Sequence, residues 1–90
     1  MKLYKYTDGR ANASGKRIRE RREAAGLSQE ELAAQLQIVG LNLNQKAISR
    51  IETGERVIPD FELLYFSKVL NVQICELLPT DEALQTFEQN

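Results

Sequence analysis

The amino-acid sequence predicts an all-helical domain, and three observations lead to this fold class. Apolar residues recur three and four positions apart through most of the chain, which is the spacing of one helix face. Glycines and helix-capping residues separate these segments at short intervals. No part of the sequence alternates β-branched with polar residues, as a half-buried strand would. A chain of 90 residues is long enough for one such domain to fold by itself.

The first predicted helix follows a polar N-terminal arm. Residues 1–13 show no sustained periodicity and are expected to form this arm. Ser14 is expected to cap a helix that runs to Ala25, and Gly26 supplies the left-handed residue that ends many helices. The apolar stripe of this helix is thin, because Ile18 and alanines are set among basic side chains: Lys16, Arg17, Arg19, Arg21 and Arg22.

The second predicted helix carries the clearest local signal. Ser28 and Glu31 form a capping box, in which the serine oxygen accepts from the backbone of position 31 and the glutamate reaches back to the serine amide. Leu27 precedes the box and is placed to pack against position 32. Three apolar residues then follow at helical spacing before Gly40 ends the segment: Leu32, Leu36 and Val39.

The third predicted helix divides its residues into an inner and an outer face. Asn44 is a good cap for residues 45–53, and Gly54 is placed to end the helix. The inward apolar residues are Ile48 and Ile51. The polar residues left on the outer face are Gln45, Lys46, Ser49 and Arg50.

Two more helices are predicted after this one. Asp60 is expected to cap the most apolar helix of the chain, at residues 61–70. A short fifth helix is expected at residues 72–78, where Cys75 is predicted to be a small buried hydrophobe. The predicted core of the five-helix bundle consists of Ile18, Leu27, Leu32, Leu36, Ile48, Ile51, Phe66 and Leu70.

The predicted organisation is therefore one globular domain between two short terminal segments. The arm at residues 1–13 precedes a domain at residues 14–78. Residues 79–90 form a C-terminal tail, in which Thr80 is placed to cap one more short helix. A helix of that length needs to dock against the domain to persist.

The composition excludes several classes of protein. The chain has no histidine, so it lacks a histidine general base and cannot form a cysteine–histidine zinc finger. Its single cysteine excludes an internal disulfide. No apolar run reaches the ~20 residues that cross a bilayer, and no signal peptide opens the sequence, so a cytoplasmic protein is expected. We therefore expect no enzyme, no metal site and no cofactor.

The net charge of −1 conceals an uneven distribution along the chain. Residues 1–56 carry eleven Lys and Arg against seven Asp and Glu, a net charge of +4. Residues 57–90 carry one basic and six acidic residues, a net charge of −5. This polarity suggests a basic face for a polyanion, although chance clustering on a solvated surface gives the same pattern.

The segment from Leu27 to Glu52 has the features of a helix-turn-helix. Two short helices lie on either side of a tight turn, and the second presents polar residues outward. In this motif the first helix lies across the DNA backbone and the second enters the major groove. The residues expected to read base edges are Gln45, Lys46, Ser49 and Arg50.

Three blocks of sequence resemble the phage-repressor or Cro-like helix-turn-helix family, also called XRE. The blocks are residues 26–33 (GLSQEELA), 47–54 (AISRIETG) and 69–72 (VLNV), and they occur in the family's order. The resemblance implies a compact five-helix, lambda-repressor-like domain that binds operator DNA, usually as a symmetric dimer. It also implies that Gln29 contacts a phosphate, that Asn44 opens the reading helix, and that Arg22 pairs internally with Glu52.

The sequence departs from the family pattern in three places. About five extra residues lie between Leu36 and Ile48. Because Val39 continues the apolar stripe and Gly40 ends it, we expect a second helix lengthened by a turn, with the connection at residues 41–43; the alternative is a longer loop on which the third helix could pivot. Arg21 stands where leucine is common, and Gln73 stands where a serine-like cap often opens the fifth helix. Arg56 follows the reading helix and is predicted, with Gln29 and Asn44, to contact phosphate.

The leading hypothesis is a sequence-specific, double-stranded-DNA-binding regulator of transcription, most simply a repressor that binds a palindromic operator as a homodimer. The alternative is an antitoxin-like or regulatory module that uses the same bundle mainly to hold a partner protein. Three surfaces are candidates for the dimer contact: the neighbourhood of Tyr65, the tail with Leu84 and Phe87, and the arm from Leu3 to Tyr6.

Overall fold

The computed structural model describes residues 5–80, and this part of the chain is helical without a strand. The prediction of an all-helical fold is thus confirmed for these residues. The elements in chain order are two 3₁₀ turns and four α-helices: η1 (Thr7–Gly9), α1 (Gly15–Ala24), α2 (Gln29–Ile38), α3 (Gln45–Thr53), α4 (Asp60–Leu70) and η2 (Ile74–Leu77).

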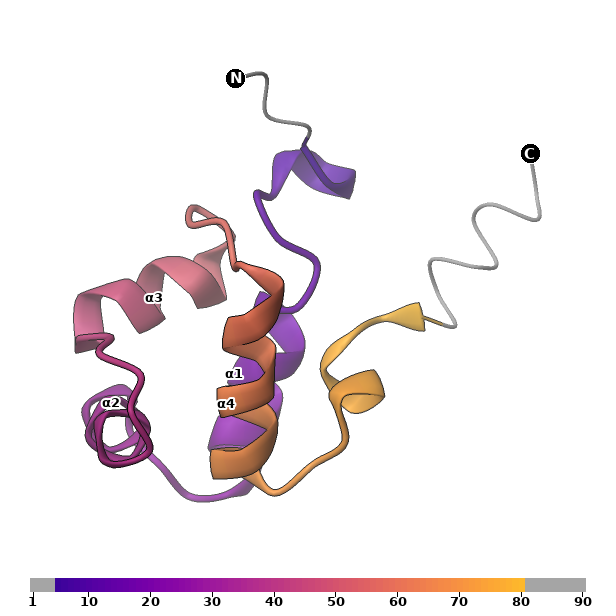
Figure 1. Cartoon of the computed structure of the whole chain (residues 1–90). Helices are drawn as coiled ribbons and strands as arrows, with labels where there is room; N and C mark the ends of the chain where they lie inside the picture. The colour runs from indigo at the N-terminus through magenta and orange to yellow at the C-terminus, as the bar shows by residue number, and fades with distance from the viewer. Residues whose placement is uncertain (1–4, 81–90) are drawn as a thin grey trace.

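Helices α1 and α4 pack against each other in the middle of the fold (Figure 1). The pair α2 and α3 covers one side of them, and the 3₁₀ turn η2 covers the other. Seven of the eight residues predicted for the core are buried, and Leu27 is half-buried against them. The side chains with no exposed surface are Ile18, Leu32, Leu36, Ile48, Ile51, Phe66 and Leu77.

The connection between α2 and α3 is fixed to the core by two leucines. Helix α2 ends at Ile38, with Val39 as its cap, and Gly40 takes a left-handed conformation with φ of 104°. Leu41 and Leu43 are both buried, and the Leu41 amide donates to the Leu36 carbonyl at 2.9 Å. The extra residues therefore form a packed connection after α2, and α3 is not free to pivot on them.

The five-helix count is not confirmed for residues 5–80. The segment predicted as a fifth helix forms only the four-residue turn η2, which Leu77 packs into the core. The Gln73 amide donates to the Glu76 carboxylate at 2.7 Å and so opens the turn without a serine cap. Cys75 projects to solvent, and the prediction that it is buried was wrong. Too few apolar side chains face inward here to support a longer helix.

Two of the predicted helix caps also differ in the structure. Asp60 is the first residue of α4, and the cap position is occupied by Pro59. Ser14 occupies the cap position of α1 but makes no side-chain bond to the helix. The amide of Gly15 donates instead to the side-chain oxygen of Asn12, at 2.7 Å. Other expectations, the Leu84 and Phe87 contact and the short helix in the tail, lie outside the described residues.

The caps of α2 and α3 have the predicted chemistry. The Ser28 hydroxyl accepts from the Glu31 amide at 3.0 Å, and the Glu31 carboxylate accepts from the Ser28 amide at 2.9 Å. The Asn44 side chain accepts from the Ala47 amide at 2.8 Å. These two residues fix where each helix of the motif begins. No helix within residues 5–80 has the length and apolar character needed to cross a membrane.

The capping box makes stability depend on pH at its acidic end. Hydrogen bonding from the Ser28 amide, and then from its hydroxyl, lowers the pKa of Glu31 below its ordinary value of 4.5. The stabilisation is therefore present above 4.5 and is lost as the pH falls through the lower folded-state pKa. Urea unfolding should show Glu31→Gln less stable than the wild type at pH 7, with a smaller difference at pH 3.

The matched control is Glu30→Gln, which removes the neighbouring charge from the same first turn without touching the cap. A stability gap between wild type and Glu31→Gln that stays constant from pH 7 to pH 3 would show that the carboxylate charge does not contribute through the capping box.

Candidate nucleic-acid interface

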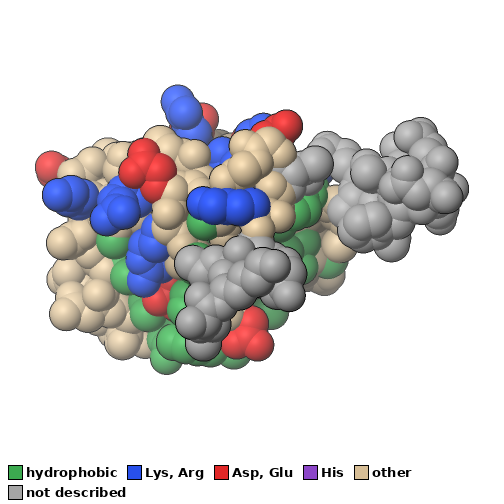
Figure 2. Space-filling view, turned by 90° about the horizontal axis from the view of Figure 1, so that it is seen from above, with side chains coloured by type: hydrophobic (Ala, Val, Ile, Leu, Met, Phe, Trp, Pro, Cys, Tyr) green, Lys and Arg blue, Asp and Glu red, His purple; other side chains and the backbone are tan. Residues whose placement is uncertain are grey.

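Helix α3 buries one face and leaves the opposite face open to solvent. Ile48 and Ile51 are fully buried, and Glu52 is 6% exposed. The four residues predicted to read bases lie on the other face, where Ser49 is half-buried and three are exposed: Gln45, Lys46 and Arg50. Seen from above, the half of the molecule that contains α2 and α3 carries separate Lys and Arg side chains, with acidic side chains between them (Figure 2). The surface is therefore polar and mixed in charge.

The two helices of the motif are joined on their polar side by a pair of glutamines. The Gln45 side-chain amide donates to the Gln29 oxygen at 2.7 Å, and the Gln29 amide donates to the Glu52 carboxylate at 3.0 Å. The residue predicted to contact phosphate and one predicted to read bases thus touch each other. The sequence spacing of 16 residues gave no sign of this contact.

Beneath the glutamines, an ion pair connects α1 to the end of α3. Arg22 donates from Nε and Nη2 to the two carboxylate oxygens of Glu52, at 2.7 and 3.0 Å. Its Nη1 donates to the Leu27 carbonyl at 2.7 Å, just before α2. Both side chains are buried, and the hydrogen bonds with Glu52 raise the pKa of Arg22. The structure thus brings together the two residues that the family resemblance assigns to an internal pair.

Three of the remaining predicted residues make contacts within the protein. Arg56 donates from both Nη atoms to the Glu62 carboxylate, at 2.8 and 3.2 Å, and these bonds raise its pKa. Arg56 is half-buried and Glu62 is buried, and this pair holds the loop after α3 against the first turn of α4. Asn44 is exposed but uses its side-chain oxygen as the cap of α3. Arg50 lies 3.6 Å from Glu55, with both side chains more than half exposed.

Three contacts near α3 were not predicted from the sequence. Glu62 as the partner of Arg56 was missed, although an acidic residue in the first turn of α4 is a weak signal for such a pair. Arg10 and Asn12 were assigned to the arm, yet their side chains bond to backbone carbonyls at the end of α3. Nothing in a polar segment without periodicity indicates such contacts.

The described residues do not offer a metal centre. Among residues 5–80, no group of three or more His, Cys, Asp or Glu side chains lies close enough to hold a metal ion. The outer face of α3 carries amide, hydroxyl, ammonium and guanidinium groups, which can form hydrogen bonds and charge interactions with a ligand.

A protein-family model described as a helix-turn-helix domain matches residues 13–84 of the chain. The matched range covers most of the chain and contains all four α-helices. A search of curated proteins finds no match. The two helices at the centre of the match are α2 and α3, whose polar faces were described above.

The buried ion pair gives a prediction about stability. Glu52→Gln should lower the free energy of unfolding by about 3 kcal/mol, because the Arg22 guanidinium is left buried without its counter-charge. Urea unfolding measures this directly. Glu55→Gln, which removes the exposed partner of Arg50, is the control and should change stability by less than about 0.5 kcal/mol.

A double substitution separates the charge from the packing. Replacing Arg22 with Met and Glu52 with Leu together should cost less than Glu52→Gln alone, because no unpaired charge remains. Equal stability of Glu52→Gln and wild type would contradict the role of the pair in holding α1 and α3 together.

Proposed function

The chain belongs to the helix-turn-helix domain family, and on this premise we propose that it binds double-stranded DNA sequence-specifically and regulates transcription without catalytic activity. The observation that carries the proposal is the exposed polar face of α3, whose start is fixed by the Asn44 cap beside the amino end of α2. A B-DNA major groove is wide enough to admit one helix. We further propose the phage-repressor-like subtype, from the three sequence blocks, and a cytoplasmic location.

The outer face of α3 supplies the side chains that base edges require. Lys46 and Arg50 are suited to the acceptor pair of guanine, and Gln45 is suited to adenine. The Ser49 hydroxyl can hydrogen-bond to donor groups and to acceptor groups of the bases. Because Gln45 already bonds to Gln29, its amide is oriented before DNA arrives.

The phosphate contacts come from the start of each helix. The free amides and positive dipole end of α2 favour an anion, and Gln29 lies at that end. Asn44 is exposed at the start of α3. Arg56 is less suited than expected, because both Nη atoms already bond to Glu62. In the proposed complex Arg56 therefore acts first as a support for the loop and only secondarily on phosphate.

Substitution of the outer face tests the proposal. Arg50→Ala and Lys46→Ala should each lose about 1–3 kcal/mol of discrimination between the preferred duplex and a scrambled one. Selection from a random DNA pool identifies the preferred duplex, and fluorescence anisotropy then measures affinity over a salt series. Binding of the wild type should weaken steeply with salt.

The control for this experiment is Arg19→Ala, which removes one positive charge from an exposed position of α1 and should leave discrimination unchanged. Discrimination by both α3 variants equal to that of the wild type would remove the assignment of α3 to the major groove. A stoichiometric protein partner together with salt-insensitive DNA binding would favour the alternative, an antitoxin-like interaction module.

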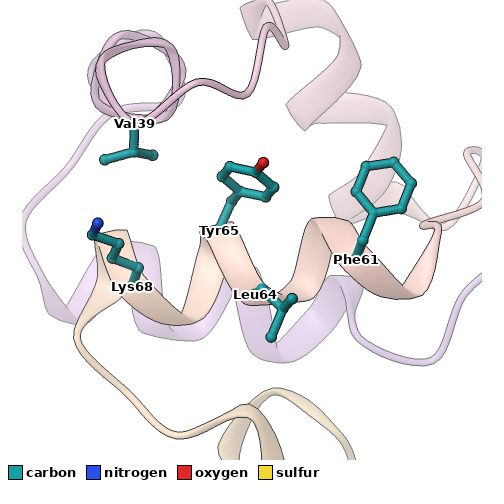
Figure 3. Close-up of a pocket in the computed structure, with 5 residues that line it drawn as sticks. All are labelled: Val39, Phe61, Leu64, Tyr65 and Lys68. Carbon is teal, nitrogen blue, oxygen red and sulfur yellow. The ribbon is translucent and has the colours of Figure 1, made fainter.

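We also propose that the protein binds a palindromic operator as a homodimer and acts as a repressor, because one small domain makes few phosphate contacts. Two half-sites would then lie about 34 Å apart, one turn of DNA. Of the three candidate dimer surfaces, the one on α4 lies wholly within the described residues. It is a shallow groove between Val39 and helix α4, and the residues of α4 that line it are Phe61, Leu64, Tyr65 and Lys68 (Figure 3).

The exposed stripe of α4 suits a second copy of the chain. Phe61 and Leu64 are 53% and 58% exposed, which is unusual for large apolar residues of one helix. Exposed Asp60 and Lys68 stand at opposite ends of this stripe. If two copies pack α4 antiparallel about a two-fold axis at Leu64, each Asp60 lies opposite a Lys68 of the other copy.

Leu64→Glu tests this surface. The variant should be monomeric in sedimentation velocity and should bind the palindromic duplex at least about tenfold more weakly, with a free energy of unfolding within about 0.5 kcal/mol of the wild type. Val57→Glu changes another exposed apolar residue outside α4 and is the control. A dimer that persists in Leu64→Glu would place the contact on a different surface.

A further inference from the structure

We propose that the pre-helix segment, residues 10–12, positions the DNA-reading helix by binding the carboxyl end of α3, with Arg10 and Asn12 as the positioning residues. The inference rests on the proposed function of α3, but the contacts that carry it are internal to the protein. Neither residue has to touch DNA to control how tightly DNA is held.

Asn12 uses both ends of its side-chain amide. Its Nδ2 donates to the Ile51 carbonyl at 3.0 Å and to the Arg56 carbonyl at 2.8 Å. Its Oδ1 accepts from the Gly15 amide at 2.7 Å. The side chain is 7% exposed. One buried asparagine thus connects the start of α1, the last turn of α3 and the loop after it.

Arg10 and the backbone next to it add two more contacts to the same end of α3. The Arg10 Nη2 donates to the Glu52 carbonyl at 2.9 Å, and the Ala11 amide donates to the Gly54 carbonyl at 2.7 Å. The Arg10 side chain covers Gly54 so closely that a Cβ there would lie 2.8 Å from its Cζ. The pre-helix segment is therefore packed onto α3 along its whole length.

These contacts meet a general requirement of helix ends. The last carbonyls of a helix have no amide of their own helix to accept from, and a cation near them is favoured by the helix dipole. In α3 the Ile51 carbonyl accepts from Asn12 as well as from the Gly54 amide, and the Glu52 carbonyl accepts from Arg10. Glu52 is consequently held by Arg22 and Gln29 at its carboxylate and by Arg10 at its carbonyl.

The space between α1 and α3 leaves no room for adjustment. A Cβ on Gly15 would lie 2.1 Å from the Ile51 carbonyl oxygen, so the first turn of α1 is in direct contact with the last turn of α3. Together with the Asn44 cap and the Gln29–Gln45 bond at its start, α3 is held at both ends. Loss of the pre-helix contacts should therefore free the carboxyl end of α3 alone.

The first part of the test measures, without DNA, whether the carboxyl end of α3 is freed when the pre-helix contacts are lost. Asn12→Asp keeps the acceptor for the Gly15 amide but loses the two donors, and Arg10→Ala loses the contact with Glu52. In both variants, amide hydrogen exchange at Gly54, Glu55 and Arg56 should accelerate about tenfold, with exchange in α2 unchanged. Exchange at these three amides equal to that of the wild type would overturn the proposal, whether or not the protein binds DNA.

The second part of the test measures DNA affinity against salt, with the duplex selected from the random pool. Both variants should bind about tenfold more weakly, while the slope of log affinity against log salt stays that of the wild type. A slope reduced by about one in Arg10→Ala identifies Arg10 as a phosphate contact and overturns the positioning role. DNA affinity equal to that of the wild type, in a variant whose amides exchange faster, also overturns the positioning role.

Two further variants keep the result interpretable. Arg10→Lys retains the cation beside the α3 carbonyls and should recover part of the affinity lost in Arg10→Ala, as a positioning role requires. Arg19→Ala removes a charge of the same sign from an exposed position of α1 and should leave exchange in α3 unchanged. If Asn12→Asp fails to fold, exchange and DNA affinity in Arg10→Ala and Arg10→Lys still test the proposal. These two variants should fold, because Arg10 is only half-buried.

Discussion

The buried pair of Arg22 and Glu52 is the contact on which the geometry of the motif depends. It joins α1 to the last turn of α3 and, through the Leu27 carbonyl, to the start of α2. A buried charge is tolerated only when its hydrogen-bonding groups are satisfied, and here three guanidinium nitrogens have partners. This requirement restricts the relative placement of α1, α2 and α3 more sharply than apolar packing alone, which is non-directional.

From this pair a line of hydrogen bonds reaches the surface. The Glu52 carboxylate accepts from Gln29, and Gln29 accepts from Gln45 on the exposed face of α3. The buried ion pair thus helps to orient Gln45, a side chain that would contact a DNA base in the proposed complex. A surface residue that is already oriented loses less conformational entropy on binding, which benefits both affinity and discrimination.

The sequence predicted the caps of α2 and α3, because the signals for them are local, whereas the caps expected at Ser14 and Asp60 differ in the structure. The caps at Ser28 and Asn44 lie within three residues of the amides they bind, and the left-handed glycine after α3 follows it directly. The failures have a different physical origin. The segment around Cys75 has capping chemistry but too few inward apolar residues for a helix, and Arg10 and Asn12 bond to carbonyls about 40 positions away. Contacts of that span depend on the completed fold.

The packing of Asn12 bears on where this domain begins. Similarity to the family starts at residue 13, whereas the carbonyls at the end of α3 receive donors from residues 10–12. A fragment that begins at residue 13 would keep all four α-helices of the described residues and lose those donors. The packed domain therefore begins earlier in the sequence than the family match does. Fusions and truncations are best placed before residue 10.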